Sequence, residues 1–145
     1  MKQDKSLRIG ARQVSIIGVF AALHAVVSLL PFTLTIGVSG QITLGVITGP
    51  LIGVLAGPVV GGAAVLVGSL IGGFLNPAGA IFGIVSFVPP TVGAVSAGLV
   101  RSAKSYLAGL IIVLSVLVFY SHPFGREVAF YPWLHLVAAA VAVLP

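Results

Sequence analysis

Apolar residues fill this chain in six long runs that short polar or turn-forming stretches separate. The runs cover residues 14–30, 42–56, 59–75, 80–100, 106–120 and 128–145. A helix of roughly 17–25 apolar residues can cross the hydrocarbon core of a bilayer. The pattern therefore predicts an all-α fold: a polytopic membrane protein built as one transmembrane domain, 1–145, with a bundle of about six helices.

Glycine and proline mark the ends of several runs. Residues 42–75 are too long for a single span, at about 51 Å as one helix. Gly57-Pro58 is the natural break, because proline suits the first turn of a helix but cannot continue the preceding one. Residues 32–41 are predicted to form a loop. If the last helix begins at Pro132, about 21 Å of helix remains, which favours a sixth span that is truncated in this sequence.

Glycines recur every fourth residue through the second and third runs. This glycine ladder consists of Gly45, Gly49, Gly53, Gly57 and Gly61, and the spacing repeats at Gly68 and Gly72. Residues four apart share one face of a helix, and small residues on that face let another backbone approach closely in a membrane. With its break at Gly57, the ladder predicts a helix hairpin that acts as the scaffold of the bundle.

Composition and charge agree with a membrane protein. Of 145 residues, 59% are hydrophobic and 6% are charged, whereas a soluble domain carries about 25% charged residues; the mean hydropathy is +1.24. With a cytoplasmic N-terminus, every basic residue except Arg126 falls in a cytoplasmic segment, as the positive-inside rule requires. The net charge of +5 forms no basic patch interleaved with aromatic residues, so nucleic-acid binding is not expected.

The residues that enzymes need are missing. Asp4 and Glu127 are the only acids, the three histidines lack metal-binding spacing, and there is no cysteine. We therefore expect no enzyme activity, no metal site and no cofactor. Coupling to protons or sodium normally requires carboxylates inside the membrane. A transporter without them must take its energy from another subunit or be passive.

Three features inside the spans allow two interpretations each. His24 lies near mid-membrane, either as a functional group or bonded to a neighbouring carbonyl. Pro89-Pro90 interrupts the fourth run, either as a structural kink or as a broken helix that lines a substrate site. Ala21 and Ala25 form a small-xxx-small strip that either packs within the chain or docks on a partner helix.

The stretch before the last run is the most polar part of the chain beyond its N-terminus. Glu127, Tyr131 and His135 are spaced by four and share a face if the helix begins before Glu127. Arg126 and Glu127 either pair with each other or bracket a zwitterionic ligand. Tyr131 and Trp133 are also typical of the aromatic belt at a membrane interface.

Four local patterns resemble the substrate-binding (S) components of energy-coupling factor (ECF) transporters. They are the basic N-terminus before Ala21-Ala22-Leu23-His24-Ala25, the Leu30–Thr33 entry to the first outer loop, the Gly57–Gly61 junction with glycines continuing to Gly73, and Asn76–Phe82 before the fourth helix. The resemblance covers most of the chain in its layout.

The resemblance implies a six-helix bundle with both termini in the cytoplasm and a substrate site in its outer half. It implies that the first helix docks on a coupling transmembrane subunit, that two cytoplasmic ATPases supply energy, and that the S component topples to release its cargo. Carried onto this chain, the docking residues are Ala21 and Ala25. The substrate-binding candidates are Phe32, Gln41, Asn76, His122, Arg126, Glu127, Tyr131, Trp133 and His135.

The expected function is thus the S component of an ATP-driven importer in a prokaryotic plasma membrane, binding a vitamin-like or other small micronutrient. The alternative is a homo-oligomeric channel or passive facilitator packed through its glycine-rich helices. A third interpretation is a structural or assembly subunit without a ligand.

Overall fold

A computed structural model describes residues 10–36, 40–77 and 83–143 of the chain. The described part is helical apart from one β-hairpin. The elements in chain order are α1 (Ala11–Leu29), β1 (Thr33–Ile36), β2 (Gly40–Thr43), α2 (Gly45–Ala56), α3 (Pro58–Leu75), the 3-10 helix η2 (Gly83–Phe87), α4 (Val88–Arg101), α5 (Ser105–Ser121), α6 (Pro123–Glu127) and α7 (Trp133–Val143).

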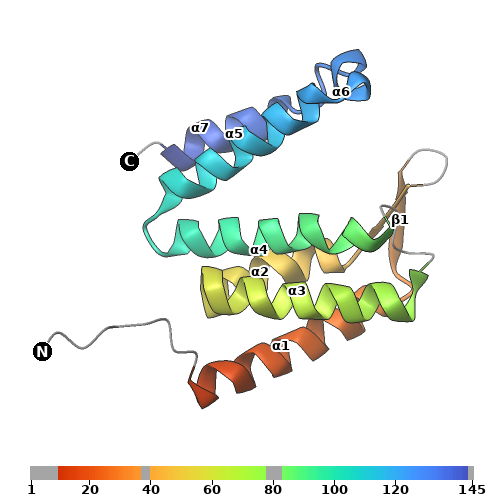
Figure 1. Cartoon of the computed structure of the whole chain (residues 1–145), viewed down its shortest axis with the longest axis vertical. Helices are drawn as coiled ribbons and strands as arrows, with labels where there is room; N and C mark the ends of the chain where they lie inside the picture. Colours follow the sequence, from red (N-terminus) through yellow and green to blue (C-terminus); the bar gives the residue numbers. More distant parts are fainter. Residues whose placement is uncertain (1–9, 37–39, 78–82, 144–145) are drawn as a thin grey trace, which may run out of the picture.

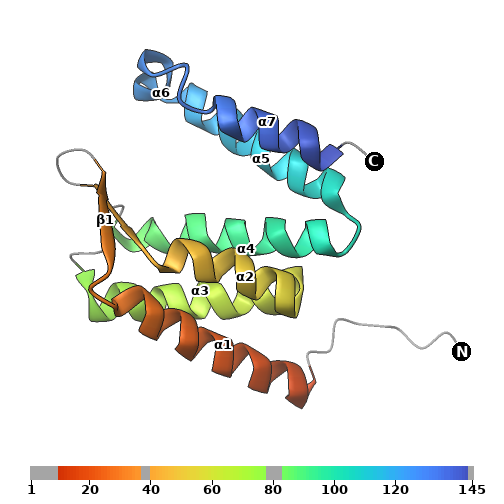
Figure 2. The ribbon, with the colours of Figure 1, turned by 180° about the vertical axis from the view of Figure 1, so that it is seen from behind.

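The helices stack in layers (Figure 1). Helix α1 packs mainly on α3, α2 packs mainly on α4, and α3 also contacts α4 and α2. Helices α5 and α7 run antiparallel to each other as an outer layer beyond α4, which is clear from behind as well (Figure 2). The β-hairpin lies at the end of the bundle where α1 ends and η2 begins. We call this the hairpin end.

The hairpin replaces the loop expected over residues 32–41. Strands β1 and β2 pair antiparallel, with Thr33 opposite Thr43 and Ile36 opposite Gly40. Thr-Leu-Thr-Ile alternates polar and apolar residues and is rich in β-branched types, both of which favour a strand. Because β2 extends to Thr43, α2 begins at Gly45 rather than at residue 42 as expected.

The glycine ladder packs helices together inside the chain. Helix α2 ends at Ala56, α3 begins at Pro58, and Gly57 between them has φ +83°, so the predicted break is confirmed. A Cβ added at Gly61 would lie 2.8 Å from Gly53 Cα, and one at Gly53 would collide with the backbone of Ala94. The ladder thus brings the backbones of α2, α3 and α4 into contact.

Pro89 and Pro90 start a helix instead of kinking one. They lie in the first turn of α4, where a proline has no hydrogen-bond partner to lose. The preceding turn is the 3-10 helix η2. The Thr91 hydroxyl donates to the Phe87 carbonyl at 2.7 Å, which satisfies one carbonyl at the junction.

The last apolar run allows a helix that starts near Val128 or near Pro132, and the structure shows the later start. Helix α6 ends at Glu127, residues 128–132 form turns, and α7 begins at Trp133 directly after Pro132. Proline lacks the amide hydrogen that an uninterrupted helix through this position needs. Residues 144–145 lie outside the described residues.

Among the residues that the structure describes, three helices are long and apolar enough to cross a membrane: Ala11–Leu29, Pro58–Leu75 and Gly83–Arg101, the last being η2 and α4 together. Helices α2, α5 and α7 are apolar but shorter. Many large apolar side chains lie on the outer surface, including Val19, Ile84 and Leu117. These properties are compatible with a location in a membrane.

Candidate functional site

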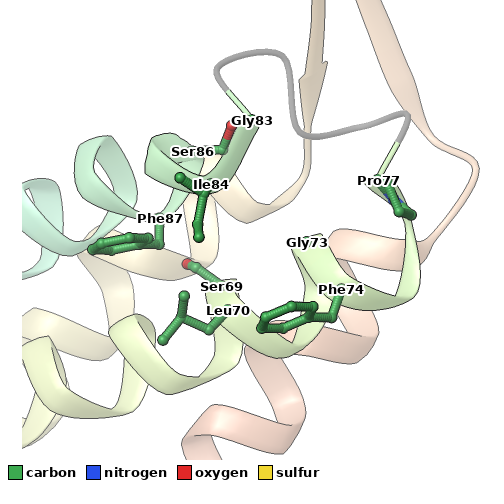
Figure 3. Close-up of a pocket in the computed structure, with 9 residues that line it drawn as sticks. All are labelled: Ser69, Leu70, Gly73, Phe74, Pro77, Gly83, Ile84, Ser86 and Phe87. Carbon is green, nitrogen blue, oxygen red and sulfur yellow. The ribbon is translucent and has the colours of Figure 1, made fainter.

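A cavity opens at the hairpin end between the last turns of α3 and the 3-10 helix η2 (Figure 3). Its volume is about 270 Å³. The walls are mostly apolar and carry two hydroxyl groups. The lining residues are Ser69, Leu70, Gly73, Phe74, Pro77, Gly83, Ile84, Ser86 and Phe87. Apolar walls with a few fixed polar groups are typical of sites that bind small molecules. We call this space the α3–η2 cavity.

The local sequence explains why the cavity lies here. Helix α3 ends at Leu75, and Asn76 at its C-terminus leaves helical geometry with φ −133° and ψ 78°. The chain returns at Gly83, whose φ of +58° is the left-handed conformation that glycine adopts without strain. Helix α4 follows from Val88. Two helix ends that do not run on into each other leave space between their side chains.

A buried histidine joins three helices beside this cavity. His24 of α1 is 1% exposed. Its Nδ1 lies 2.8 Å from the Thr48 hydroxyl of α2, and its Nε2 lies 3.0 Å from the Ser69 hydroxyl of α3. The ring therefore bonds to two side-chain hydroxyls rather than to the backbone carbonyl expected from the sequence. Ser69 belongs both to this group and to the cavity wall.

The His24 group does not form a metal site. Its partners are hydroxyls, and the described parts of the chain contain no group of three His, Cys, Asp or Glu side chains that could hold a metal ion. Both ring nitrogens are already within hydrogen-bond distance of Thr48 and Ser69. The group can instead hold three helices in register and orient the Ser69 hydroxyl.

Three site candidates from the first half of the sequence lie at the hairpin end. Asn76 precedes Pro77 of the cavity wall and is exposed. Phe32 lies between α1 and β1 with 67% of its surface exposed. Gln41 lies in β2, opposite Thr35, and its side chain is outside the described part. Of these three, Asn76 is the one adjacent in sequence to the cavity lining.

The six candidates from the second half of the sequence belong to the outer layer, from the end of α5 through α6 at the hairpin end to the start of α7 (Figure 1), and none of them lines the α3–η2 cavity. These residues are His122, Arg126, Glu127, Tyr131, Trp133 and His135. The Tyr131 ring is 6.3 Å from the His135 ring and 5.9 Å from the Phe119 ring, and Phe130 stacks on Trp133. Such aromatic groups suit a membrane interface.

Arg126 caps a helix rather than pairing with Glu127. Its Nε donates to the Tyr120 carbonyl at 3.1 Å, and its Nη2 donates to the Ser121 carbonyl at 3.4 Å. These carbonyls are at the C-terminus of α5, where a cation is favoured by the helix dipole. Across the described ranges, the Glu127 side chain makes no hydrogen bond or ion pair.

This capping role predicts the effect of removing the guanidinium. Arg126→Met should destabilise the chain by about 0.5 kcal/mol and leave solute affinity unchanged, because the residue lies outside the cavity. Thermal unfolding in detergent, with Glu127→Gln as the matched control, measures the stability. A variant with normal stability and weakened solute binding would instead place Arg126 in the solute site.

Ala21 and Ala25 face inward. They are 3% and 4% exposed, and a Cβ added at Gly68 of α3 would lie 2.6 Å from the Ala21 carbonyl oxygen. Of the two interpretations, packing within the chain is the one that the structure shows for this strip. The opposite face of α1 is exposed and includes Gly18 and Ala22.

Sequence reasoning missed the polar members of the site. Thr48 and Ser69 are single hydroxyl residues in otherwise apolar runs. A hydroxyl inside a span commonly bonds across helices in a membrane bundle, so each was a signal that His24 has side-chain partners. The apolar lining, including Leu70 and Phe87, carried no signal in the sequence, because any lipid-facing residue has the same composition.

Comparison with known proteins gives one relative. The chain is 36% identical over 81 residues to an uncharacterised protein of Methanocaldococcus jannaschii. The matched region is 56% of this chain and 27% of that protein, so the chain spans about a quarter of its relative's length. No family model and no solved structure matches the chain.

Proposed function

We propose that this chain is the membrane-embedded substrate-binding subunit of an ECF-type ATP-driven importer and takes up a vitamin-like or other small micronutrient. The observation that carries the proposal is the α3–η2 cavity. Its volume of about 270 Å³ is near the lower end of the range for small-molecule pockets. The cavity has apolar walls and a hydroxyl that a buried histidine orients. The proposal assigns the chain no catalytic role and no cofactor.

The distribution of charge supports the orientation that such an importer needs. Helix α1 begins and α4 ends at the same end of the bundle, opposite the hairpin end (Figure 1), and these termini carry Arg12, Arg101 and Lys104. Arg126 is on the outer layer at the hairpin end. With the N-terminus in the cytoplasm of a prokaryotic cell, this arrangement obeys the positive-inside rule, and the cavity faces outward.

Three shorter helices are proposed to cross the membrane together with the three long ones, which gives about six spans. Helices α2, α5 and α7 are shorter but predominantly apolar, and β2 directly precedes α2 at the hairpin end. Short helices cross where the bilayer thins or where flanking segments complete the passage. Asp4 and Glu127 are the only acids in the chain, so the energy for uptake is proposed to come from a coupling transmembrane subunit and two cytoplasmic ATPases.

The alternative of a homo-oligomeric channel assigns the glycine ladder to contacts between copies. Within one chain, however, Gly53 already meets Ala94, Gly61 meets Gly53, and Gly68 meets Ala21. Those faces are occupied by the chain's own helices. The geometry therefore favours the binding subunit over the channel.

Purification from native membranes tests the proposal. The tagged chain, extracted in mild detergent, is expected to carry one further membrane protein and two ATPase subunits identified by peptide mass spectrometry, with ATP hydrolysis in the purified complex. An unrelated tagged membrane protein of the same cell is the control. A discrete homo-oligomer that lacks ATPases and passes solutes without ATP would contradict the proposal.

A further inference from the structure

A row of polar groups runs from the backbone of α2 to the α3–η2 cavity. The Thr48 hydroxyl lies 3.3 Å from the Gly45 carbonyl oxygen and 2.8 Å from His24 Nδ1. His24 Nε2 lies 3.0 Å from the Ser69 hydroxyl, which lines the cavity. Each group in the row touches the next, so the direction of one hydrogen bond determines the others.

The carbonyl oxygen of Gly45 fixes that direction, because a carbonyl accepts and never donates. Thr48 has one hydroxyl hydrogen, and donating it to Gly45 leaves its oxygen to accept from His24 Nδ1–H. A neutral imidazole carries one N–H, so Nε2 accepts the hydrogen of Ser69. With this tautomer of His24, all three hydrogen bonds form: Thr48 to Gly45, His24 to Thr48 and Ser69 to His24. The reverse assignment forfeits the bond from Thr48 to Gly45.

The consequence appears in the cavity. The Ser69 hydrogen points to His24, so the Ser69 oxygen offers the cavity only its lone pairs. The wall around Ser69 is apolar and aromatic, with Leu70 and Phe74, and the second hydroxyl of the cavity, that of Ser86, lies on the η2 side (Figure 3). A polar group that enters such a wall is stabilised only where it finds its complement. Ser69 complements a donor and leaves an acceptor unpaired.

We infer that the α3–η2 cavity selects a flat, largely apolar solute that consists of one ring or two fused rings. The solute presents an N–H or O–H donor to Ser69. This inference rests on the proposed solute-binding function and adds the chemical class of the solute. Thr48 and His24 act as positioning residues, because they set the direction in which the Ser69 hydroxyl points. The cavity volume of about 270 Å³ suits a ring system of this size, and the wall residues Phe74 and Ile84 are largely exposed.

Two ring probes of nearly equal shape test the donor. Indole carries an N–H where benzofuran carries an acceptor oxygen. Equilibrium dialysis against the chain in lipid nanodiscs, with empty nanodiscs subtracted, gives both dissociation constants. The chain is expected to favour indole by about 3- to 10-fold, the range for one net hydrogen bond.

Three variants locate that preference. Ser69→Ala should bring the ratio of the two dissociation constants close to one, whereas Ser86→Ala, on the opposite wall of the same cavity, should leave the preference for indole unchanged.

Thr48→Val retains the side-chain volume but removes the acceptor that holds the proton on His24 Nδ1. The proton can then move to Nε2 and free the Ser69 hydrogen, so this substitution outside the cavity should also abolish the preference. A purely structural role of Thr48 would lower both affinities and leave their ratio unchanged.

The outcomes separate the two proposals. If the unaltered chain binds both rings equally or prefers benzofuran, the donor assignment is wrong and the binding site stands. If it binds neither ring, the cavity is not a site for solutes of this class, and the inference falls with it. The pull-down of ATPase subunits is independent of either result and reports on the importer alone.

Discussion

Gly53→Ala is expected to destabilise the folded chain strongly. A Cβ at this position collides with backbone atoms of Ala94 in α4, and backbone atoms cannot rotate away as a side chain can. Overpacking in a well-packed core typically costs about 1–3 kcal/mol, and a backbone collision in the centre of the bundle should reach the upper end of that range. Alanine is otherwise the best helix former, so the loss would report packing alone.

Gly18→Ala is the matched control, because a Cβ at Gly18 of α1 has no other atom within 4 Å. Thermal unfolding of both variants, followed by circular dichroism in the same detergent, compares the same chemical change in two environments. The control should unfold at or above the temperature of the unaltered chain. A Gly53→Ala variant as stable as the control would show that α2 and α4 do not meet as described.

Leu70→Trp is expected to abolish solute binding while the chain still folds. Leu70 lines the α3–η2 cavity, and the larger indole ring would occupy the space that the solute needs. The cavity lies at the periphery of the bundle, between a helix end and η2, so the added volume fills empty space instead of straining the packed glycine contacts.

Ile71→Trp provides the comparison at the neighbouring position. Ile71 is 42% exposed and does not belong to the cavity lining, so the same bulky residue there points away from the site. This variant should bind solute like the unaltered chain. Equal loss of binding in both variants would mean that the tryptophan disturbs α3 as a whole. The loss would then be no evidence that the solute binds in the cavity.

The scaffold was predictable because glycine and proline act locally. Gly57 can adopt φ +83° and Pro58 can begin a helix whatever surrounds them. The four-residue spacing of the ladder, which includes Gly53 and Gly61, indicates which face of each helix must lack side chains. These requirements belong to the residues themselves, and the structure confirms the break between α2 and α3 and the close packing of their backbones.

The sequence predicts a loop in place of the hairpin and leaves two alternative starts for α7. Strand β1 is four residues long, too short for its alternation to stand out beside loop-forming glycines. At the other end, the apolar residues from Val128 onward allow a helix from there, whereas Pro132 favours a later start, and α7 begins at Trp133.

The site depended on tertiary information that a single sequence does not contain. His24 was evident as an ionisable residue within a span. Its partners were not, because the depth and rotation of α2 and α3 decide whether Thr48 and Ser69 reach the ring. The polar composition around Arg126 predicts a binding site there, whereas the Arg126 guanidinium caps the C-terminus of α5.

A small solute is expected to occupy the α3–η2 cavity. The most direct measurement is mass spectrometry of a solvent extract from the chain purified out of native membranes, compared with Leu70→Trp and Ile71→Trp purified in the same way. One small organic molecule is expected in near-stoichiometric amount from the unaltered chain and from Ile71→Trp, and none from Leu70→Trp. The same molecule recovered equally from all three proteins, or no molecule from any of them, would contradict this expectation.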